Sequence, residues 1–114
     1  MSLVQFTLNT QEDIKYKSMY LDIKKNTTLN DVFNLLSDLT NNKIELNKNK
    51  IVINQNLYML DDLTSNFINF LTDQQIEYNE LDDLEIICFA NLVTPPLVFN
   101  QYLTDIYKNH INTN

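Results

Sequence analysis

Several residue types are missing or scarce in this chain, and each absence excludes a class of function. Its 114 residues include no glycine, no tryptophan and no arginine, with one cysteine, one histidine and two prolines. A glycine-rich phosphate loop is excluded, because no other residue lets the backbone approach a phosphate so closely. The guanidinium groups that read guanine or clamp phosphate are also missing. Turns that need a positive φ must use Asn or Asp, as in Asn47-Lys48-Asn49 and Asn54-Gln55-Asn56.

The charge balance argues against two kinds of partner. The formal net charge is −7, so nucleic acid and anionic membrane surfaces would both be repelled. The sequence contains no apolar run of about 20 residues and no basic, apolar leader, which predicts neither a membrane helix nor a signal peptide. A single cysteine excludes an internal disulfide, so we expect an intracellular, cytoplasmic setting. The abundance of Asn, Ile and Lys indicates an AT-rich genome.

The length fits one compact core. Hydrophobic residues make up 44% of the chain, which is enough to build that core. The only natural boundary is Pro95-Pro96, because two prolines fix φ and remove backbone donors. We therefore expect one domain over residues 1–94 and an extension, a Pro-Pro turn and an amphipathic helix, over residues 95–114.

Alternating apolar and polar residues predict most of a sheet. The expected strands cover residues 3–8, 18–24, 44–46, 51–53 and 84–90, with a polar loop over 9–17. The first two strands should form a hairpin, and the third and fourth a second pairing. The last, dense in β-formers, should be central and well buried. Residues 61–71 suit either a short helix or, from Phe67 onward, a strand.

Two segments have helical spacing of their apolar residues. Residues 29–39 carry one stripe that includes Val32, Phe33 and Leu36, and Thr28 with Asp31 predicts a capping box at its start. Asn41-Asn42 is the expected stop. A second stripe follows the prolines and is our candidate partner-binding surface: Phe99, Tyr102, Leu103, Ile106 and Tyr107.

The order strand, strand, helix, strands, final strand resembles the ubiquitin-like β-grasp. Within that group the chain is most similar to the sulfur-carrier branch, the ubiquitin-related modifier and the small subunit of molybdopterin synthase. Val4-Gln5-Phe6 resembles the opening strand, residues 67–78 resemble a hairpin of the modifier, and residues 81–89 resemble the acidic turn and last strand. The resemblance spans residues 3–93 and implies a mixed sheet crossed by one helix, with the last strand beside the first.

The chain departs from those carriers after the last strand. Carriers end in Gly-Gly, which is adenylated and converted to a thiocarboxylate or an isopeptide. At the matching place this chain has residues 91–96, which end in Pro-Pro, and 18 more residues follow. The resemblance therefore implies the fold without the carrier chemistry.

The candidate catalytic residues favour ordinary structural roles. Cys88 lies among apolar neighbours, so a buried core cysteine is expected. His110, the only histidine, lies near the end of the predicted C-terminal helix. Acidic residues cluster at 61–62 and 77–85, where solvated turns are the default. We expect no catalytic residues, no metal and no cofactor.

Three functions are consistent with the sequence. The first is a non-catalytic ubiquitin-like protein-interaction module. The second is a degenerate sulfur-carrier or modifier relative that docks on a carrier-type enzyme without being adenylated. The third is a small enzyme that uses its acidic residues, which would need a deep pocket holding two carboxylates.

Overall fold

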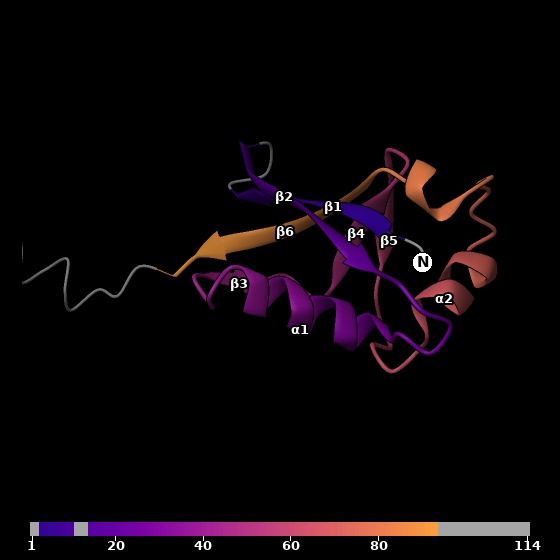
Figure 1. The fold of residues 1–114 in the computed structure, drawn as a ribbon, viewed down its shortest axis with the longest axis horizontal. Helices are drawn as coiled ribbons and strands as arrows, with labels where there is room; N and C mark the ends of the chain where they lie inside the picture. The colour runs from indigo at the N-terminus through magenta and orange to yellow at the C-terminus, as the bar shows by residue number, and fades with distance from the viewer. Residues whose placement is uncertain (1–2, 11–13, 94–114) are drawn as a thin grey trace, which may run out of the picture.

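A computed structural model describes residues 3–10 and 14–93 of the chain (Figure 1). The strands in this part are β1 (Leu3–Thr10), β2 (Ile14–Asp22), β3 (Ile44–Leu46), β4 (Lys50–Ile53), β5 (Asn56–Met59) and β6 (Ile86–Leu92). The helices are α1 (Leu29–Leu39) and α2 (Phe67–Asp73), with one 3-10 turn at Leu81–Asp83. This confirms the α+β class.

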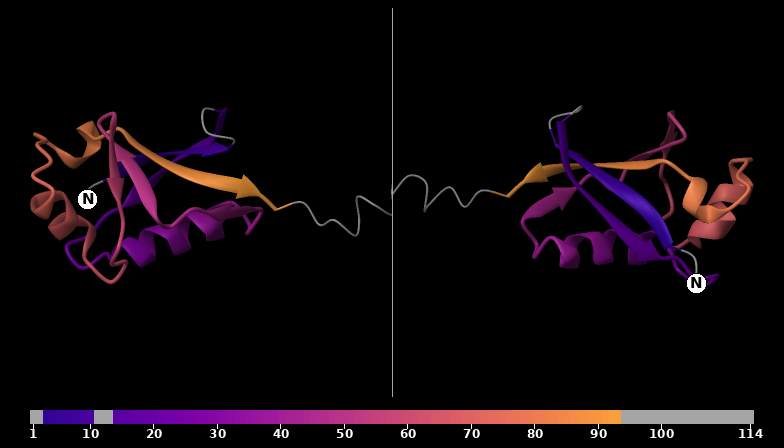
Figure 2. Two further views of the ribbon diagram at one scale, coloured as in Figure 1. Left: turned by 180° about the vertical axis from the view of Figure 1, so that it is seen from behind. Right: turned by 45° about the horizontal axis from the view of Figure 1, so that its top comes forward.

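The strands form one mixed sheet in the order β2-β1-β6-β4-β5, and β3 also pairs with β6. β1 and β6 are parallel, with Phe6 beside Ile86, and every other pair is antiparallel. The predicted central position of the last strand beside the first is confirmed. α1 lies along one face of this sheet, and no other described helix covers the opposite face (Figures 1 and 2).

α1 confirms the sequence prediction at both ends. The Oγ1 of Thr28 accepts a hydrogen bond from the Asp31 N–H at 3.0 Å, and the Asp31 Oδ2 accepts one from the Thr28 N–H at 3.0 Å. Asn41 and Asn42 follow the helix with φ of 56° and 57°, values that Asn tolerates better than most residues. The predicted stripe, Val32, Phe33 and Leu36, is buried against the sheet.

The two predicted Asn-rich turns differ in construction. Asn54 and Gln55 have φ of 51° and 70°, so they form a tight hairpin of type I′ between β4 and β5. Asn47-Lys48-Asn49 was predicted to use positive φ, and this is wrong. There the Oδ1 of Asn47 accepts from the Asn49 N–H at 2.9 Å, an Asx turn.

The predicted pairing of residues 44–46 with 51–53 is wrong. β3 and β4 both pair antiparallel with β6, one after the other, so the two strands run in the same direction and the chain does not reverse between them. β3 lies beside residues 90–92, with Ile44 opposite Leu92, and β4 lies beside residues 86–87, with Val52 opposite Ile87.

Two further expectations are wrong. The predicted loop over residues 9–17 is largely strand, because β1 continues to Thr10 and β2 begins at Ile14. Residues 14–17 at the start of the edge strand β2 are all exposed, which hides the alternation. The resembled hairpin over residues 67–78 is also wrong, because residues 67–73 form a helix, which was one of the two alternatives for residues 61–71. Its buried residues are Phe67, Phe70 and Leu71, at i, i+3 and i+4.

Candidate functional site

The face of the sheet opposite α1, the open face, carries an apolar row. Ile87 of β6 lies opposite Val52 of β4, and Val52 lies opposite Leu57 of β5. Side chains of directly paired residues project from the same face, so these three form a continuous row across three strands. Lys50 and Met59, paired two residues further along, extend the same surface.

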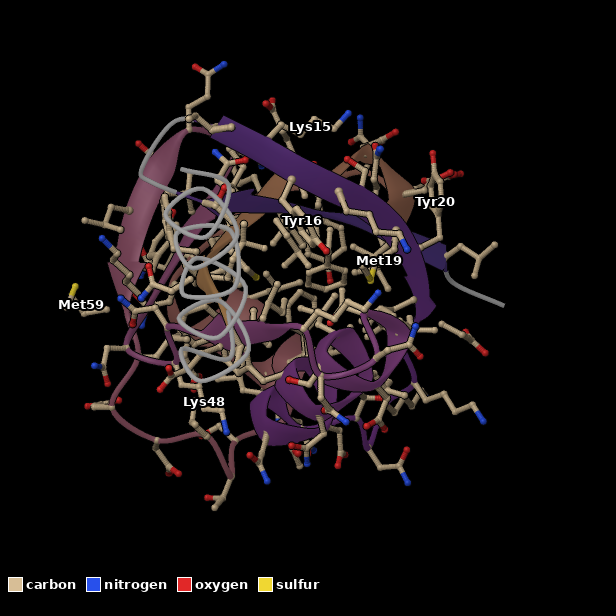
Figure 3. The ribbon with its side chains drawn as sticks, turned by 90° about the vertical axis from the view of Figure 1, so that its left-hand side faces the viewer. Lys15, Tyr16, Met19, Tyr20, Lys48 and Met59 are labelled. Atoms are coloured by element: carbon tan, nitrogen blue, oxygen red, sulfur yellow. The ribbon has the colours of Figure 1, made fainter. Side chains whose placement is uncertain are left out.

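The members of this row are accessible. Leu57 is 58% exposed and Met59 65% exposed, while Val52 and Ile87 are half-buried. Figure 3 shows Met59 pointing away from the molecule, in contrast to Met19, which points into the interior. Leu57 and Met59 lie on the short edge strand β5, so a partner can reach them directly.

A cation–π contact adds a second residue of β6 to this surface. The Nζ of Lys50 lies 4.6 Å from the ring centroid of Phe89, a half-buried residue two positions beyond Ile87. On the β1–β2 half of the open face, Thr7 and Ser18 form a polar centre, and their hydroxyl oxygens are 3.1 Å apart. That half also carries Leu3 and Tyr20 near its far end, at 44% and 62% exposure. The continuous apolar row is therefore the part of the face built from β4, β5 and β6.

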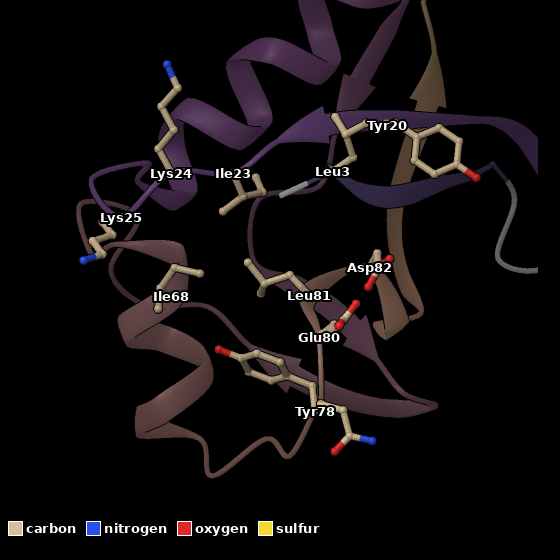
Figure 4. A pocket seen from close by; sticks show the side chains of 11 residues that line it. Leu3, Tyr20, Ile23, Lys24, Lys25, Ile68, Tyr78, Glu80, Leu81 and Asp82 are labelled. Carbon is tan, nitrogen blue, oxygen red and sulfur yellow. The ribbon is translucent and has the colours of Figure 1, made fainter. Parts of the chain in front are cut away.

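A second surface, the end hollow, lies where the start of β1 meets α2. Its volume is about 810 Å³. Four aliphatic residues line its centre, drawn from four separate parts of the chain: Leu3, Ile23, Ile68 and Leu81 (Figure 4).

The rim of the end hollow is charged with opposite signs on opposite sides. Lys24 and Lys25 lie on one side, and Glu80 and Asp82 on the other, as Figure 4 shows. All four side chains are exposed. Two tyrosines complete the rim, Tyr20 at 62% exposure and Tyr78 at 37%.

Short-range hydrogen bonds hold both sides of the rim. The Lys24 N–H donates to the Oγ1 of Thr27 at 3.0 Å, and the Thr27 N–H donates to the Lys24 carbonyl at 3.1 Å. Opposite, the Glu80 N–H donates to the Oδ2 of Asp83 at 3.3 Å and begins the 3-10 turn. Both rims are thus built from local turns with fixed backbones.

Of the residues singled out from the sequence, Glu80 and Asp82 of the acidic cluster at 77–85 border the end hollow. The candidate stripe, Phe99 to Tyr107, and His110 lie outside the described residues, so their expected roles stay predictions. The residues of the open face were not identified from the sequence, because residues 84–89 were predicted to form a central, well-buried strand. A signal was present, since Ile87 and Phe89 alternate with the buried Ile86 and Cys88.

Cys88 is fully buried, as expected, and burial raises the pKa of its thiol from 9.0 to about 12. Such a thiol is unsuited to nucleophilic chemistry. The Thr64 hydroxyl, at 2.6 Å, and the Thr64 N–H, at 3.0 Å, lower the pKa of Asp62, whose carboxylate shapes the turn before α2. The described ranges contain no cluster of three or more His, Cys, Asp or Glu side chains able to hold a metal ion.

Comparison with known proteins found no matching protein family, no matching curated protein and no matching solved structure. Within residues 3–10 and 14–93, no helix has the length and apolar character that a membrane crossing requires.

Proposed function

We propose that this chain is a ubiquitin-like β-grasp protein and acts as a non-catalytic protein-interaction module through its open face. The strand order β2-β1-β6-β4-β5, with one helix across the sheet, supports the β-grasp assignment. The fold leaves one sheet face for binding, because α1 covers the other. The predicted stripe at Phe99 to Tyr107 is a second candidate surface of the same function.

One observation carries this proposal: the apolar row of Ile87, Val52 and Leu57 reaches the solvent together with Met59. Contiguous exposed apolar surface is costly in water and marks binding sites in soluble proteins. Methionine suits such surfaces, because its flexible thioether adapts to different partners. Thr7 and Ser18 on the β1–β2 side and Lys50 on the β4 side would then form the polar rim that interfaces usually have.

We expect the double substitution Leu57→Lys and Met59→Lys to abolish partner binding while the domain stays folded. Two charged side chains in the centre of an interface would be desolvated without a counter-charge, which lowers affinity by at least about tenfold. The measurement is quantitative capture of proteins from a lysate of the source cell on the immobilised chain, compared with wild type.

The matched control is Leu35→Lys with Leu39→Lys on the outer side of α1, where these leucines are 40% and 49% exposed. It makes the same chemical change and should leave capture unchanged. Equal capture by the β5 variant and wild type would refute binding through the open face.

One feature favours the degenerate-carrier function as the second candidate. β6 is central and lies beside β1, and it leads directly into the C-terminal segment, as in the resembled carriers. Incubation of the 114-residue chain with ATP and a sulfur-carrier activating enzyme should yield no acyl-adenylate and no thiocarboxylate by intact mass, because the chain has no glycine. Docking on that enzyme without modification would favour the second candidate, and a thiocarboxylate mass shift would contradict both.

The third candidate, an acid-dependent enzyme, gains little support. Glu80 and Asp82 border the end hollow, but both side chains are exposed, whereas this candidate needs two carboxylates held in a deep pocket. The buried Cys88 has no access to a substrate. These features support the proposal that the module is not catalytic.

A further inference from the structure

We propose that the end hollow binds a short peptide segment of a partner protein, in which an apolar anchor is flanked by an acidic residue on one side and a basic residue on the other. This inference rests on the proposed protein-binding function, but the end hollow shares no residue with the apolar row of Ile87, Val52 and Leu57.

The aliphatic interior of the end hollow determines which side chain of a peptide can be anchored there. Leu3 is 44% exposed, Ile68 and Leu81 are half-buried, and Ile23 closes the floor at 4% exposure. A volume of about 810 Å³ is within the range of ligand-binding clefts, roughly 300–1,000 Å³. Such a hollow accommodates one or two large aliphatic or aromatic side chains, and their burial would remove the exposed surface of Leu3 from water.

The charged rim of the end hollow determines which charges the peptide should carry on either side of its apolar anchor. Lys24 and Lys25 lie on the side of the turn after β2, and Glu80 and Asp82 lie on the opposite side. The lysine side chains extend outward from the hollow in Figure 4, so they would meet the flank of a ligand that leaves the hollow on that side. A phosphate or nucleotide would meet the two carboxylates, and a cation would meet the two lysines. A ligand that carries one charge at each end satisfies both sides, and an amphipathic peptide has this arrangement.

The tyrosines favour a peptide as the occupant. Tyr20 and Tyr78 lie at the mouth, and each offers a large apolar ring with a hydroxyl that can bond to a peptide backbone. Tyrosine is frequent in protein-binding surfaces for this reason, since its side chain loses little conformational entropy on binding.

The test begins with a random dodecapeptide library displayed on phage and selected on the immobilised full chain. We expect enriched sequences to share a Leu, Ile or Phe anchor with Asp or Glu on one flank and Lys on the other. A synthetic peptide with the enriched sequence is then titrated, and amide NMR shifts should concentrate at residues 23–25 and 78–82.

Charge reversal tests the rim. Lys24→Glu with Lys25→Glu should weaken the selected peptide at least tenfold, and a peptide with lysines in place of its acidic flank should regain affinity for this variant. Asp82→Lys should weaken the same peptide and be rescued by an acidic replacement of its basic flank. The matched control, Lys43→Glu with Lys48→Glu, alters the same charge elsewhere on the surface and should leave affinity unchanged.

The two proposals fail separately. No enrichment, enriched peptides without the opposed charges, or affinity lost only in Leu57→Lys with Met59→Lys would overturn the peptide site. Peptide binding that depends on the rim charges supports the peptide site. If the variant with Leu57→Lys and Met59→Lys captures cellular partners as wild type does, only binding through the open face is refuted.

Discussion

Replacing Phe67 with alanine is expected to lower the free energy of unfolding by about 3–5 kcal/mol, the usual cost of removing a buried aromatic ring. Phe67 is fully buried at the start of α2, and its ring centroid lies 5.8 Å from that of Phe6 in β1. A domain of this size is stable by about 5–15 kcal/mol, so this one change would remove a large part of the total.

The ring is difficult to replace because the backbone around it is fixed. The Phe67 N–H donates to the Thr27 carbonyl at 2.8 Å. The next residue after Thr27 and the one before Phe67, Thr28 and Asn66, form an isolated antiparallel β-bridge. The helix start cannot move inward to fill the cavity without breaking these bonds. Partial collapse is therefore prevented, which places the expected cost toward the upper end of the range.

Urea unfolding followed by circular dichroism measures the effect. The matched control is Tyr20→Ala, which removes a ring that is 62% exposed and should alter stability by no more than about 0.5 kcal/mol. A loss below about 1 kcal/mol for Phe67→Ala would contradict the packing of α2 against β1.

The parts of the fold that local chemistry determines could be predicted from sequence. α1 is the clearest case, because its capping box and its stop at Asn41 and Asn42 depend on residues within one turn of the helix ends. The hairpin at Asn54 and Gln55 is another. The sequence also carried the signal for α2, since the apolar residues Phe67, Phe70 and Leu71 fall at i, i+3 and i+4, and the structure buries all three.

Long-range pairing could not be predicted in the same way. Alternation in residues 44–46 shows that two side chains face the core, but it does not say which strand lies alongside. β3 pairs with β6, about 45 residues away, because β6 is long enough to hold β3 and β4 in succession. The same limit applies to the open face, where Ile87, Val52 and Leu57 become one row only when the strand register is known.

The end hollow is the least predictable feature. Its four central residues, Leu3, Ile23, Ile68 and Leu81, come from four separate segments, and none of them lies in a sequence motif. The acidic residues 80 and 82 were read as part of a solvated turn, which is correct for each residue alone. They become candidates for ligand binding only because the fold places Lys24 and Lys25 on the opposite side of the end hollow.

Cys88 is expected to react with iodoacetamide at least about a thousandfold more slowly in the native protein than in the unfolded chain. Burial raises its pKa from 9.0 to about 12, and below both values a difference of three pKa units reduces the reactive thiolate by that factor. Labelling near pH ~8, followed by intact mass, measures the rate with and without guanidinium chloride. Free N-acetylcysteine in the same buffers supplies the reference rate.

The direction of the shift also fixes a pH dependence. Because the folded-state pKa lies above the unfolded value of 9.0, the unfolded chain loses its thiol proton first as the pH rises. This group therefore leaves stability unaltered below pH 9.0 and lowers it between pH 9.0 and about 12. Cys88→Ala should remove that part of the alkaline loss, and an unchanged alkaline profile in this variant would contradict the burial of a neutral thiol.

Native labelling that does occur should follow opening of the fold, since the thiol is fully covered. Its rate is then proportional to the population of open molecules, which rises as stability falls. Phe67→Ala, at about 3–5 kcal/mol, should accelerate native labelling by roughly two to four orders of magnitude, while Tyr20→Ala should leave it nearly unchanged. Fast labelling that is insensitive to Phe67→Ala would mean that Cys88 is reached without unfolding, and that β6 is not protected at its centre.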